Sequence, residues 1–494
     1  MSKNTLKLSN PSLLKQQCFI KDGWHEASDN DNGNNSATIE VSNPFTGEVI
    51  GTVPSLSKED VNEAVAYSHD AQTAWAAKTA QERSELLQKW ADLIDANKED
   101  LAIIMTAEQG KPLTESRGEI GYANSFIRWF SEEGKRVYGD TIPANKSQLR
   151  HVILKQPIGV CAAITPWNFP AAMITRKAAP ALASGCTMII KPASETPFSA
   201  LALGVLAEQA GIPAGVIQVV TGKSSVIGDI LTSDVRIQKL SFTGSTEVGR
   251  TLMAQCAPTV KKLSLELGGN APFIVFDDAD LEKAAEGLIA SKYRNAGQTC
   301  VCANRVYVQD SIKDKFLEIF VKKVTELKVG NGMEEGVDIG PLINKDGLEK
   351  VQALLNDALD KGAKIVTGGD TNPASALSFN PTVITDLSTD MEIASEEIFG
   401  PIATIFIFSD EEEVIRKAND TIYGLAAYFY SNDYARSWRV TEGLEYGIVG
   451  HNTGLISTEV APFGGVKQSG FGREGSKYGI EEYVVTKYWC SDIS

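Results

Sequence analysis

The sequence predicts an α/β protein with two doubly wound units in series. From residue 159 onward, short apolar runs alternate with segments of helical periodicity, and strands that alternate with helices form mostly parallel sheets. The alternation is interrupted by Glu266-Leu-Gly-Gly-Asn270 and then resumes. At 494 residues the chain is too long for a single hydrophobic core, so we expect two or three domains.

The composition is typical of a globular protein in water. Hydrophobic residues make up 43% and charged residues 22% of the chain. The net charge of −16 argues against nucleic acid and anionic membranes as partners, although a local pocket can still bind a small anion. No apolar run approaches the ~18 residues of a membrane span. The N-terminus shows no export or transit signal, so we expect a cytoplasmic protein.

The cysteines and histidines indicate neither a disulfide framework nor a metal site. The seven cysteines are odd in number and scattered, which fits a reducing compartment. Cys300 and Cys302 are close in sequence, but without further cysteine or histidine spacing they are weak evidence for metal. The four histidines show no metal-ligand or triad spacing.

The N-terminal part combines short strands with two capped helices. Residues 1–56 are typical of strands and turns, and the run 29–35 predicts a polar, mobile loop. Ser57-Lys-Glu-Asp60 and Thr79-Ala-Gln-Glu82 match the capping box, in which a hydroxyl and a carboxylate satisfy free backbone N–H groups. In the second helix, apolar residues at helical spacing predict a core-facing side. They are Leu86, Leu87, Trp90, Leu93 and Ile94.

The next part of the chain predicts a parallel sheet with a nucleotide site. The predicted strands are 159–164, 187–190, 216–220, 239–242 and 272–276, and the predicted helices are 171–183, 198–210, 224–231 and 246–256. In such sheets, ligands bind beyond the carboxyl ends of the strands. Polar segments follow four of the strands, at 165–168, 191–194, 221–222 and 243–249. This coincidence favours a nucleotide at that edge.

A second α/β series begins after Asn270. Its predicted helices are 312–327 and 348–361, and its predicted strands include 364–366 and 402–408. Cys300 opens this half, in the small-residue segment Asn295–Arg305. A cleft between the units would have nucleotide on one wall and a thiol on the other, a usual place for an active site.

Taken singly, these motifs also have ordinary structural explanations. Gly244-Ser-Thr-Glu-Val-Gly249 suits a phosphate at a helix N-terminus, but it lacks the middle glycine of Gly-x-Gly-x-x-Gly and is equally a tight turn. Asn168 lies between two prolines and is typical of a turn, and Glu266 could be a loop carboxylate. Cys300 could be a buried small hydrophobic residue. The alternatives stay open at this level.

In combination, the motifs resemble the aldehyde dehydrogenase superfamily. They are Pro166-Trp-Asn-Phe-Pro170, Phe242-Thr-Gly-Ser-Thr246, Glu266-Leu-Gly-Gly-Asn270, Gly297-Gln-Thr-Cys300 and Glu396-Glu-Ile-Phe-Gly-Pro401, in family order across nearly the whole chain. Three further segments resemble the succinate-semialdehyde dehydrogenase branch. They are Ile174-Thr-Arg-Lys177, Cys300-Val-Cys302 and Pro462-Phe-Gly-Gly-Val-Lys-Gln-Ser-Gly470.

The resemblance implies three domains and an oligomer. A Rossmann-like cofactor domain would comprise residues 1–137 and 158–266, and a catalytic domain residues 267–470. Residues 138–157 and 471–494 would form a small β arm for oligomerisation, because 147–155 and 482–489 alternate as edge strands that pairing would satisfy. We expect a homo-oligomer, dimer or tetramer, with no nucleic-acid or membrane partner.

The resemblance also implies the catalytic roles. Cys300 would attack the aldehyde carbon to form a thiohemiacetal, and the Asn168 amide and the Cys300 backbone N–H would hold the oxyanion. Hydride transfer would leave a thioester, and Glu266 would activate the water that releases the acid. A carboxylate suits this role when burial raises its pKa toward neutrality. Because Glu266 is present, a CoA-dependent acylating enzyme is disfavoured.

The cofactor is expected to be NADP, with NAD less preferred. The family pattern assigns it to Trp167, Lys191, Ser194, Thr243, Gly244, Ser245, Leu267, Glu397 and Phe399. Relatives that prefer NAD often carry Glu at the position of Ser194, where a carboxylate would repel a 2′-phosphate. Ser194 together with Lys191 accepts that phosphate, although Glu195 is adjacent.

The expected substrate is succinate semialdehyde, a small molecule with a carboxylate at its far end. Arg176, Arg294 and Ser457 match the residues that clamp this carboxylate in the branch, and the guanidinium fork suits bidentate binding. The alternatives are internal salt bridges for the two arginines, glutarate semialdehyde or a broader range of aldehydes as substrate, and a non-catalytic homologue. Cys302 matches a cysteine that forms a reversible disulfide with the nucleophile in parts of the branch.

Overall fold

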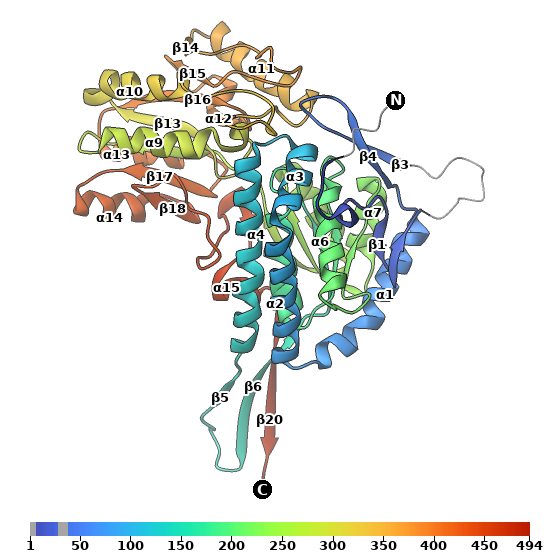
Figure 1. The fold of residues 1–494 in the computed structure, drawn as a ribbon. Helices are drawn as coiled ribbons and strands as arrows, with labels where there is room; N and C mark the ends of the chain where they lie inside the picture. The colour runs from blue at the N-terminus through green and yellow to red at the C-terminus, as the bar shows by residue number, and fades with distance from the viewer. Residues whose placement is uncertain (1–5, 28–37) are drawn as a thin grey trace.

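The computed structural model describes residues 6–27 and 38–494 (Figure 1). The predicted loop at 29–35 lies outside these residues. Within the described ranges, no helix is long and apolar enough to cross a membrane. The structure has two large sheets, each covered by helices, and a slender β arm that projects from the body below α2 and α15 (Figure 1). The predicted fold class is confirmed.

The first sheet has eight strands in the order β19-β11-β10-β7-β8-β9-β1-β2. The five central strands are parallel, and β19 and β1 join them antiparallel. The strands are β1 Cys18–Ile20, β2 Gly23–His25, β7 Val160–Ile164, β8 Met188–Lys191, β9 Ile217–Val219, β10 Ile237–Thr243, β11 Lys262–Glu266 and β19 Gly470–Phe471.

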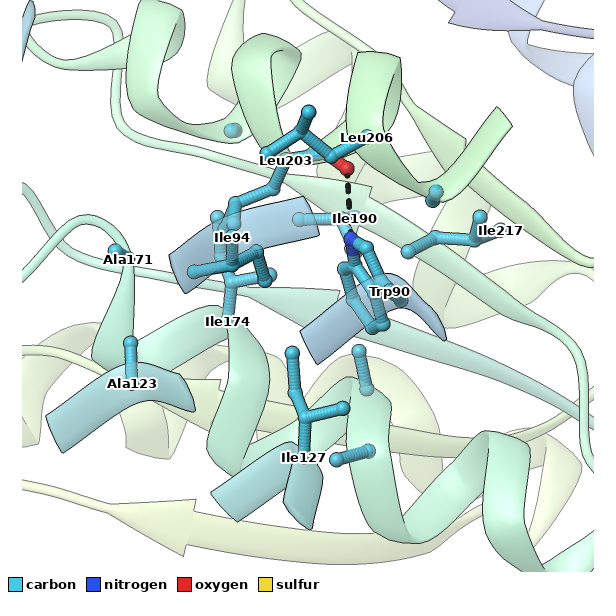
Figure 2. Close-up of a cluster of buried hydrophobic side chains, with 14 of the residues drawn as sticks. Trp90, Ile94, Ala123, Ile127, Ala171, Ile174, Ile190, Leu203, Leu206 and Ile217 are labelled. Carbon is cyan, nitrogen blue, oxygen red and sulfur yellow. Dashed lines mark hydrogen bonds between the residues drawn. The ribbon is translucent and has the colours of Figure 1, made fainter. Parts of the chain in front are cut away.

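Helices cover both faces of this sheet. One layer contains α2 Ala80–Ala96, α3 Lys98–Gln109, α4 Leu113–Glu133, α5 Ala172–Ser184 and α6 Pro197–Gln209, and the other contains α1 Lys58–Ala77, α7 Ser224–Ser233 and α8 Thr246–Cys256. Both predicted capping boxes are present, at Ser57 and at Thr79. Trp90 and Ile94 of α2 are buried between α4, α5 and α6, and the Trp90 indole donates a hydrogen bond to the Leu203 carbonyl at 3.1 Å (Figure 2). The predicted core-facing side of α2 is therefore confirmed.

The second sheet has seven strands in the order β14-β15-β16-β13-β12-β17-β18, all parallel except β14. Its strands are β12 Ala271–Val275, β13 Ala303–Gln309, β14 Lys364–Thr367, β15 Thr382–Thr385, β16 Ile402–Phe408, β17 Ala426–Tyr430 and β18 Ile448–His451. Helices α9 Leu281–Lys292, α10 Lys313–Thr325 and α11 Lys345–Asp360 pack on one face, and α13 Glu411–Asn419 and α14 Tyr434–Gly443 on the other. The short α12, Glu392–Ser395, packs against α11.

Two details differ from the sequence expectation. The strand predicted at 272–276 is β12, which pairs with β13 and β17 and so belongs to the second sheet, not to the first series. The helix predicted at 348–361 begins earlier, at Lys345, because the Asn344 side chain accepts a hydrogen bond from the Gly347 N–H and caps it. Periodicity detects the apolar face of a helix but not its polar first turn.

The arm is a three-stranded antiparallel sheet in the order β20-β6-β5. It consists of β5 Asp140–Ile142, β6 Leu149–Pro157 and β20 Val484–Asp492, and β20 pairs with β6 along its whole length. Between β19 and β20, the short helix α15 Ser476–Glu481 packs on α4 and α5. A separate hairpin, β3 Thr38–Ser42 with β4 Val49–Pro54, lies near the N-terminus. The predicted domain limits stay a prediction.

Candidate active site

Two cavities meet at Cys300, between the two α/β units. One, of about 320 Å³, is here named the arginine cavity. It is lined by Glu115, Gly118, Glu119, Tyr122, Phe169, Met173, Arg176, Arg294, Thr299, Cys300, Val301, Leu455, Ser457 and Phe463. The other, of about 360 Å³ and here named the strand-end cavity, lies beyond β10 and β11. Among the residues that the structure describes, Cys300 alone lines both.

The chain reaches Cys300 through a strained turn. Asn295, Ala296 and Gly297 have φ angles of 52°, 55° and 76°, a left-handed run that costs free energy for the two residues that carry a Cβ. The half-buried Glu115 carboxylate holds the turn, because its two oxygens accept the Asn295 N–H at 2.9 and 3.1 Å. A Cβ at Gly297 would lie 2.2 Å from the Gly400 carbonyl oxygen, which explains why this position of the motif is glycine.

The Cys300 thiol is only partly exposed, at the junction of the two cavities. Burial raises its pKa to about 12. The Arg176 and Arg294 guanidiniums act to lower this pKa, whereas the Glu397 and Glu266 carboxylates act to raise it. The free protein therefore keeps the sulfur protonated at neutral pH, and its nucleophilic form requires a base or an added positive charge.

Asn168 is buried beside the Cys300 turn, and its backbone is tied to that turn. Its side-chain amide donates to the Gln298 carbonyl at 3.0 Å, and its own carbonyl accepts from Asn295 Nδ2 at 3.0 Å and from Lys111 Nζ at 2.6 Å. One N–H of the Asn168 amide is left for a ligand. The Cys300 backbone N–H donates no hydrogen bond within the described chain.

Glu266 ends β11 and is fully buried, with no hydrogen-bond partner for Oε2. Burial and the nearby Glu474 carboxylate raise its pKa well above the ordinary value, and Arg176 and Lys177 act in the opposite direction. Glu474 itself forms ion pairs with Arg176 at 2.7 Å and Lys177 at 2.5 Å. Glu266 lines neither cavity, but its charge reaches the Cys300 sulfur. A buried carboxyl whose pKa is raised in this way suits a general base.

The strand-end cavity brings together seven of the nine predicted cofactor residues. They are Trp167, Thr243, Gly244, Ser245, Leu267, Glu397 and Phe399. Ser245 caps α8 by accepting a hydrogen bond from the Val248 N–H at 3.3 Å, so the positive end of this helix faces the cavity. The cap and the N-terminal part of α11 also line this cavity, through Asn344, Asp346, Gly347 and Lys350. Sequence reasoning missed this segment, although Asn344 followed by Lys-Asp-Gly has the form of a helix cap.

Glu397 and Phe399 come from the loop before β16. The Glu397 carboxylate accepts the Gly269 N–H at 3.1 Å, and burial raises its pKa to about 7. Phe399 adopts a φ of 53° and meets the Trp167 ring edge-on at 5.5 Å between ring centroids. A Cβ at Gly269 would lie 2.3 Å from the Cys300 carbonyl oxygen, so this glycine lets the two catalytic segments approach each other.

Lys191 is the last residue of β8 and Ser194 follows in the next loop, and neither lines either cavity. Lys191 is 5% exposed, and its ammonium donates to Ser224 Oγ at 2.8 Å. Burial lowers its pKa, and the Glu195 carboxylate partly offsets this. No carboxylate of the described residues lies within ion-pair distance of Lys191. A buried cation without an anionic partner fits a phosphate group.

The three predicted substrate residues, Arg176, Arg294 and Ser457, all line the arginine cavity. Arg176 is 2% exposed, forms the ion pair with Glu474 and packs over the Phe463 ring at 3.8 Å. Arg294 forms no ion pair with any described residue and lies over Phe169 at 5.3 Å. The salt-bridge alternative therefore applies to Arg176 and not to Arg294.

Four buried polar groups that line the arginine cavity have atoms without a hydrogen-bond partner. They are Tyr122 OH, Arg176 Nη2, Arg294 Nε and Thr299 Oγ1. Sequence reasoning missed Tyr122 and Thr299. Thr299 precedes the nucleophile and could have been found from that position, whereas nothing in the local pattern distinguishes Tyr122 from any other aromatic residue on a helix.

Cys302 lies behind the turn and lines neither cavity. It is buried, and its thiol donates to the Lys292 carbonyl at 3.5 Å. Burial raises its pKa, and the Lys292 ammonium acts to lower it. Both cysteines are free thiols in this structure, and the disulfide between them stays a prediction.

Comparisons with known proteins identify the family of this chain. The model of the aldehyde dehydrogenase family matches residues 32–489. A succinate-semialdehyde dehydrogenase [NADP(+)] of Escherichia coli K12 is 57% identical, covering 98% of this chain and 99% of the relative. A glutarate-semialdehyde dehydrogenase of Pseudomonas putida is 58% identical, covering 99% of this chain and 100% of the relative. The crystal structure of an aldehyde dehydrogenase from Brucella melitensis biovar abortus 2308 is 63% identical with a TM-score of 0.97, covering 99% of this chain and 100% of that one. The chain therefore belongs to the aldehyde dehydrogenase family.

Proposed function

We propose that this enzyme oxidises succinate semialdehyde to succinate with NADP⁺ as the oxidant. The observation that carries the proposal is the arginine cavity, which ends at the Cys300 thiol and contains unpartnered hydrogen-bonding atoms on Tyr122, Arg176, Arg294 and Thr299. Buried donors without acceptors are costly. A ligand that carries a carboxylate at its far end would supply the missing acceptors while its aldehyde reaches the sulfur.

Arg294 is the strongest candidate for the carboxylate anchor. It is the cavity arginine that forms no ion pair with a described carboxylate, so its charge is available to a substrate. Arg176 is held by Glu474 and offers only its unpartnered Nη2. Ser457 adds a hydroxyl on the same cavity wall. A charge-assisted contact of this kind compensates a carboxylate for the loss of water.

The catalytic step follows from the groups around the sulfur. The Cys300 thiol releases its proton to water, and the sulfur adds to the aldehyde carbon. The oxyanion that forms accepts hydrogen bonds from the free N–H of Asn168 and from the Cys300 backbone N–H. Each such donor is typically worth about 3–4 kcal/mol in the transition state. Glu266 takes a proton from the water that hydrolyses the thioester to the acid, because its raised pKa makes it an effective acceptor near neutrality.

The strand-end cavity fits a nicotinamide dinucleotide. The N-terminus of α8 suits the pyrophosphate, the Glu397 carboxylate suits a ribose, and Trp167 and Phe399 suit a flat ring beside the thiol. Bound there, the cofactor supplies the acceptor for the two electrons that leave the substrate. The buried, unpaired Lys191 and the neutral Ser194 favour the extra phosphate of NADP over NAD.

Glutarate semialdehyde is the second candidate substrate. A relative of that name is 58% identical over nearly the whole chain. The two substrates differ by one methylene, which changes discrimination by only ~1–3 kcal/mol. Both compounds satisfy the same unpartnered donors, so the cavity chemistry favours neither strongly.

We also propose that the protein is a homo-oligomer that assembles through the arm. Strand β20 carries Tyr488 and Trp489, each 56% exposed, and Val485, 43% exposed. Large exposed apolar side chains on a strand of a small projecting sheet are typical of a protein interface. Light scattering of the purified protein distinguishes dimer, tetramer and monomer, and a monomer would contradict the proposal.

The proposed reaction is tested by a steady-state matrix. Succinate semialdehyde, glutarate semialdehyde and butanal, a neutral four-carbon aldehyde, are each assayed with NAD⁺ and NADP⁺ by the absorbance of the reduced cofactor. The expected result is the highest kcat/KM with succinate semialdehyde and NADP⁺. Equal kcat/KM for butanal would contradict the carboxylate anchor, and no turnover with any aldehyde would indicate a non-catalytic homologue.

A further inference from the structure

The Tyr122 hydroxyl lines the arginine cavity and has no hydrogen-bond partner. Tyr122 lies on α4, and its oxygen is shielded from solvent although the cavity reaches its side chain. The Phe126 ring meets it edge-on at 5.0 Å between centroids, one helical turn further along, and fixes the orientation of the phenol. A buried hydroxyl that forms no hydrogen bond in the free protein is costly, so its location in the cavity requires an explanation.

The surroundings of Tyr122 make its hydroxyl a donor. Burial raises the pKa of the phenol, and the Glu474 carboxylate acts in the same direction. The Arg176 and Arg294 guanidiniums act to lower it, as does the Ser457 side chain, which is near the phenol although no hydrogen bond reaches the Tyr122 oxygen. The phenol therefore keeps its proton at neutral pH, and it lies near two guanidiniums and one carboxylate. A protonated hydroxyl can donate one hydrogen bond, and the two guanidiniums beside it favour an acceptor that is itself negative.

The carboxylates of the cavity wall are already occupied. Both Glu115 oxygens accept the Asn295 N–H. Glu119 accepts from Lys111 Nζ at 2.6 Å through one oxygen and from the Ala171 and Ala172 N–H groups through the other. Within the described part of the chain, the Tyr122 hydroxyl forms no hydrogen bond to these carboxylates or to any other group, so it is available to an acceptor on the ligand.

We propose that Tyr122 is a specificity-determining residue, whose hydroxyl donates a hydrogen bond to the distal carboxylate of the substrate beside Arg294. The inference rests on the proposed function and adds a residue to it. Tyr122 contributes a neutral donor, so it recognises the carboxylate without adding a third positive charge to a cavity that already holds two guanidiniums. Because the contact lies far from the reacting carbon, it stabilises the bound substrate and the transition state alike and acts on KM more than on kcat.

The test is Tyr122→Phe, which removes one oxygen and keeps the ring. With saturating NADP⁺, kcat/KM for succinate semialdehyde should fall roughly 10- to 100-fold, as for loss of one hydrogen bond to a charged group. The fall should lie mainly in KM, and kcat/KM for butanal should change little. Tyr428→Phe is the matched control, because that phenol also is buried near Cys300 but donates to the Val301 carbonyl at 2.7 Å and lines neither cavity. It should affect both aldehydes equally.

The outcomes separate this inference from the proposed function. If wild-type enzyme prefers succinate semialdehyde over butanal and Tyr122→Phe keeps the same preference, Tyr122 has only a structural role and the inference is wrong. If wild-type enzyme shows no such preference, both ideas fail together. Thermal melting checks that the Tyr122→Phe variant is folded. If it is not, the test is repeated with Tyr122→Met, in which an unbranched apolar side chain without a hydroxyl replaces the phenol.

Discussion

The two cavities that meet at Cys300 are built in different ways. The strand-end cavity is formed by strand ends and by the N-terminal parts of α8 and α11, and the capping side chains Ser245 and Asn344 are fixed there by hydrogen bonds within the fold. The arginine cavity is formed by side chains from α4, α5 and the segment before β13, and several of its polar atoms lack partners. The strand-end cavity is therefore preformed for a common cofactor. In the arginine cavity, the unpartnered polar atoms gain hydrogen-bond partners only when the ligand binds.

The Cys300 turn lies between the two cavities, and the chemistry at both cavities depends on it. The turn is braced from the arginine side by Glu115 and from the strand-end side by Asn168. The comparison therefore predicts that substitution of a residue that acts on the sulfur from outside both cavities, such as Glu266, affects all substrates. Substitutions in the arginine cavity should affect acidic substrates, and substitutions near the strand ends should affect cofactor choice.

The largest effect is expected for Glu266→Gln, which removes the base that thioester hydrolysis requires for every aldehyde substrate. The kcat should fall about 10²- to 10⁴-fold for succinate semialdehyde and for butanal alike. Because the carboxyl pKa is raised by burial, wild-type kcat should increase with pH as Glu266 loses its proton, and this increase should be absent in the variant. Rapid mixing should still show one turnover of reduced cofactor, since thioester formation precedes the step that needs the base. A kcat within the wild-type range would refute the assignment.

Arg294→Ala should separate acidic from neutral substrates. Arg294 is the arginine of the cavity that forms no ion pair with a described carboxylate. Its loss should raise KM for succinate semialdehyde roughly 100-fold and change KM for butanal little. Arg294→Lys is the matched control, because it keeps the charge and loses the fork, and it should be intermediate. Equal losses on both aldehydes would mean that Arg294 supports the Cys300 turn and not the substrate. Arg176 is less suitable for this test, because its removal also leaves Glu474 with one cation fewer.

Ser194→Glu should change cofactor choice without changing aldehyde choice. A carboxylate near Lys191 would form an ion pair with it, accept a hydrogen bond from a free 2′-hydroxyl and repel a 2′-phosphate. The ratio of kcat/KM for NADP⁺ to that for NAD⁺ should fall roughly 10-fold or more, the effect of about 1.4 kcal/mol. Ser194→Ala serves as the control and should keep the wild-type ratio. An unchanged ratio in Ser194→Glu, or a wild-type enzyme that already prefers NAD⁺, would contradict the assignment of the phosphate to this place.

The same contrast explains what could be predicted from the sequence. Strand ends and helix caps are local, so Thr243, Gly244, Ser245 and the approximate course of both sheets follow from periodicity and turn chemistry. The arginine cavity unites residues far apart in the chain, and Arg176, Arg294 and Ser457 were predicted by resemblance and not by spacing. Tyr122 was missed because its role depends on which neighbours lack partners, and that information exists only in the folded structure.

The smallest effect on basal activity is expected at Cys302, which lines neither cavity. Cys302→Ala should leave kcat/KM for all aldehydes nearly unchanged, because the buried thiol interacts with the backbone carbonyl and the side chain of Lys292 and lines neither cavity. Its effect should appear under oxidation. If Cys302 pairs with Cys300, peroxide should inactivate the wild-type enzyme reversibly by dithiothreitol, whereas the variant should lose this reversible component. The two residues are i and i+2, and Cys302 is directed into the core, so the disulfide requires the turn to rearrange. Bound NADP⁺ should slow inactivation by covering the sulfur from the strand-end side, and identical inactivation of both proteins would exclude the pairing.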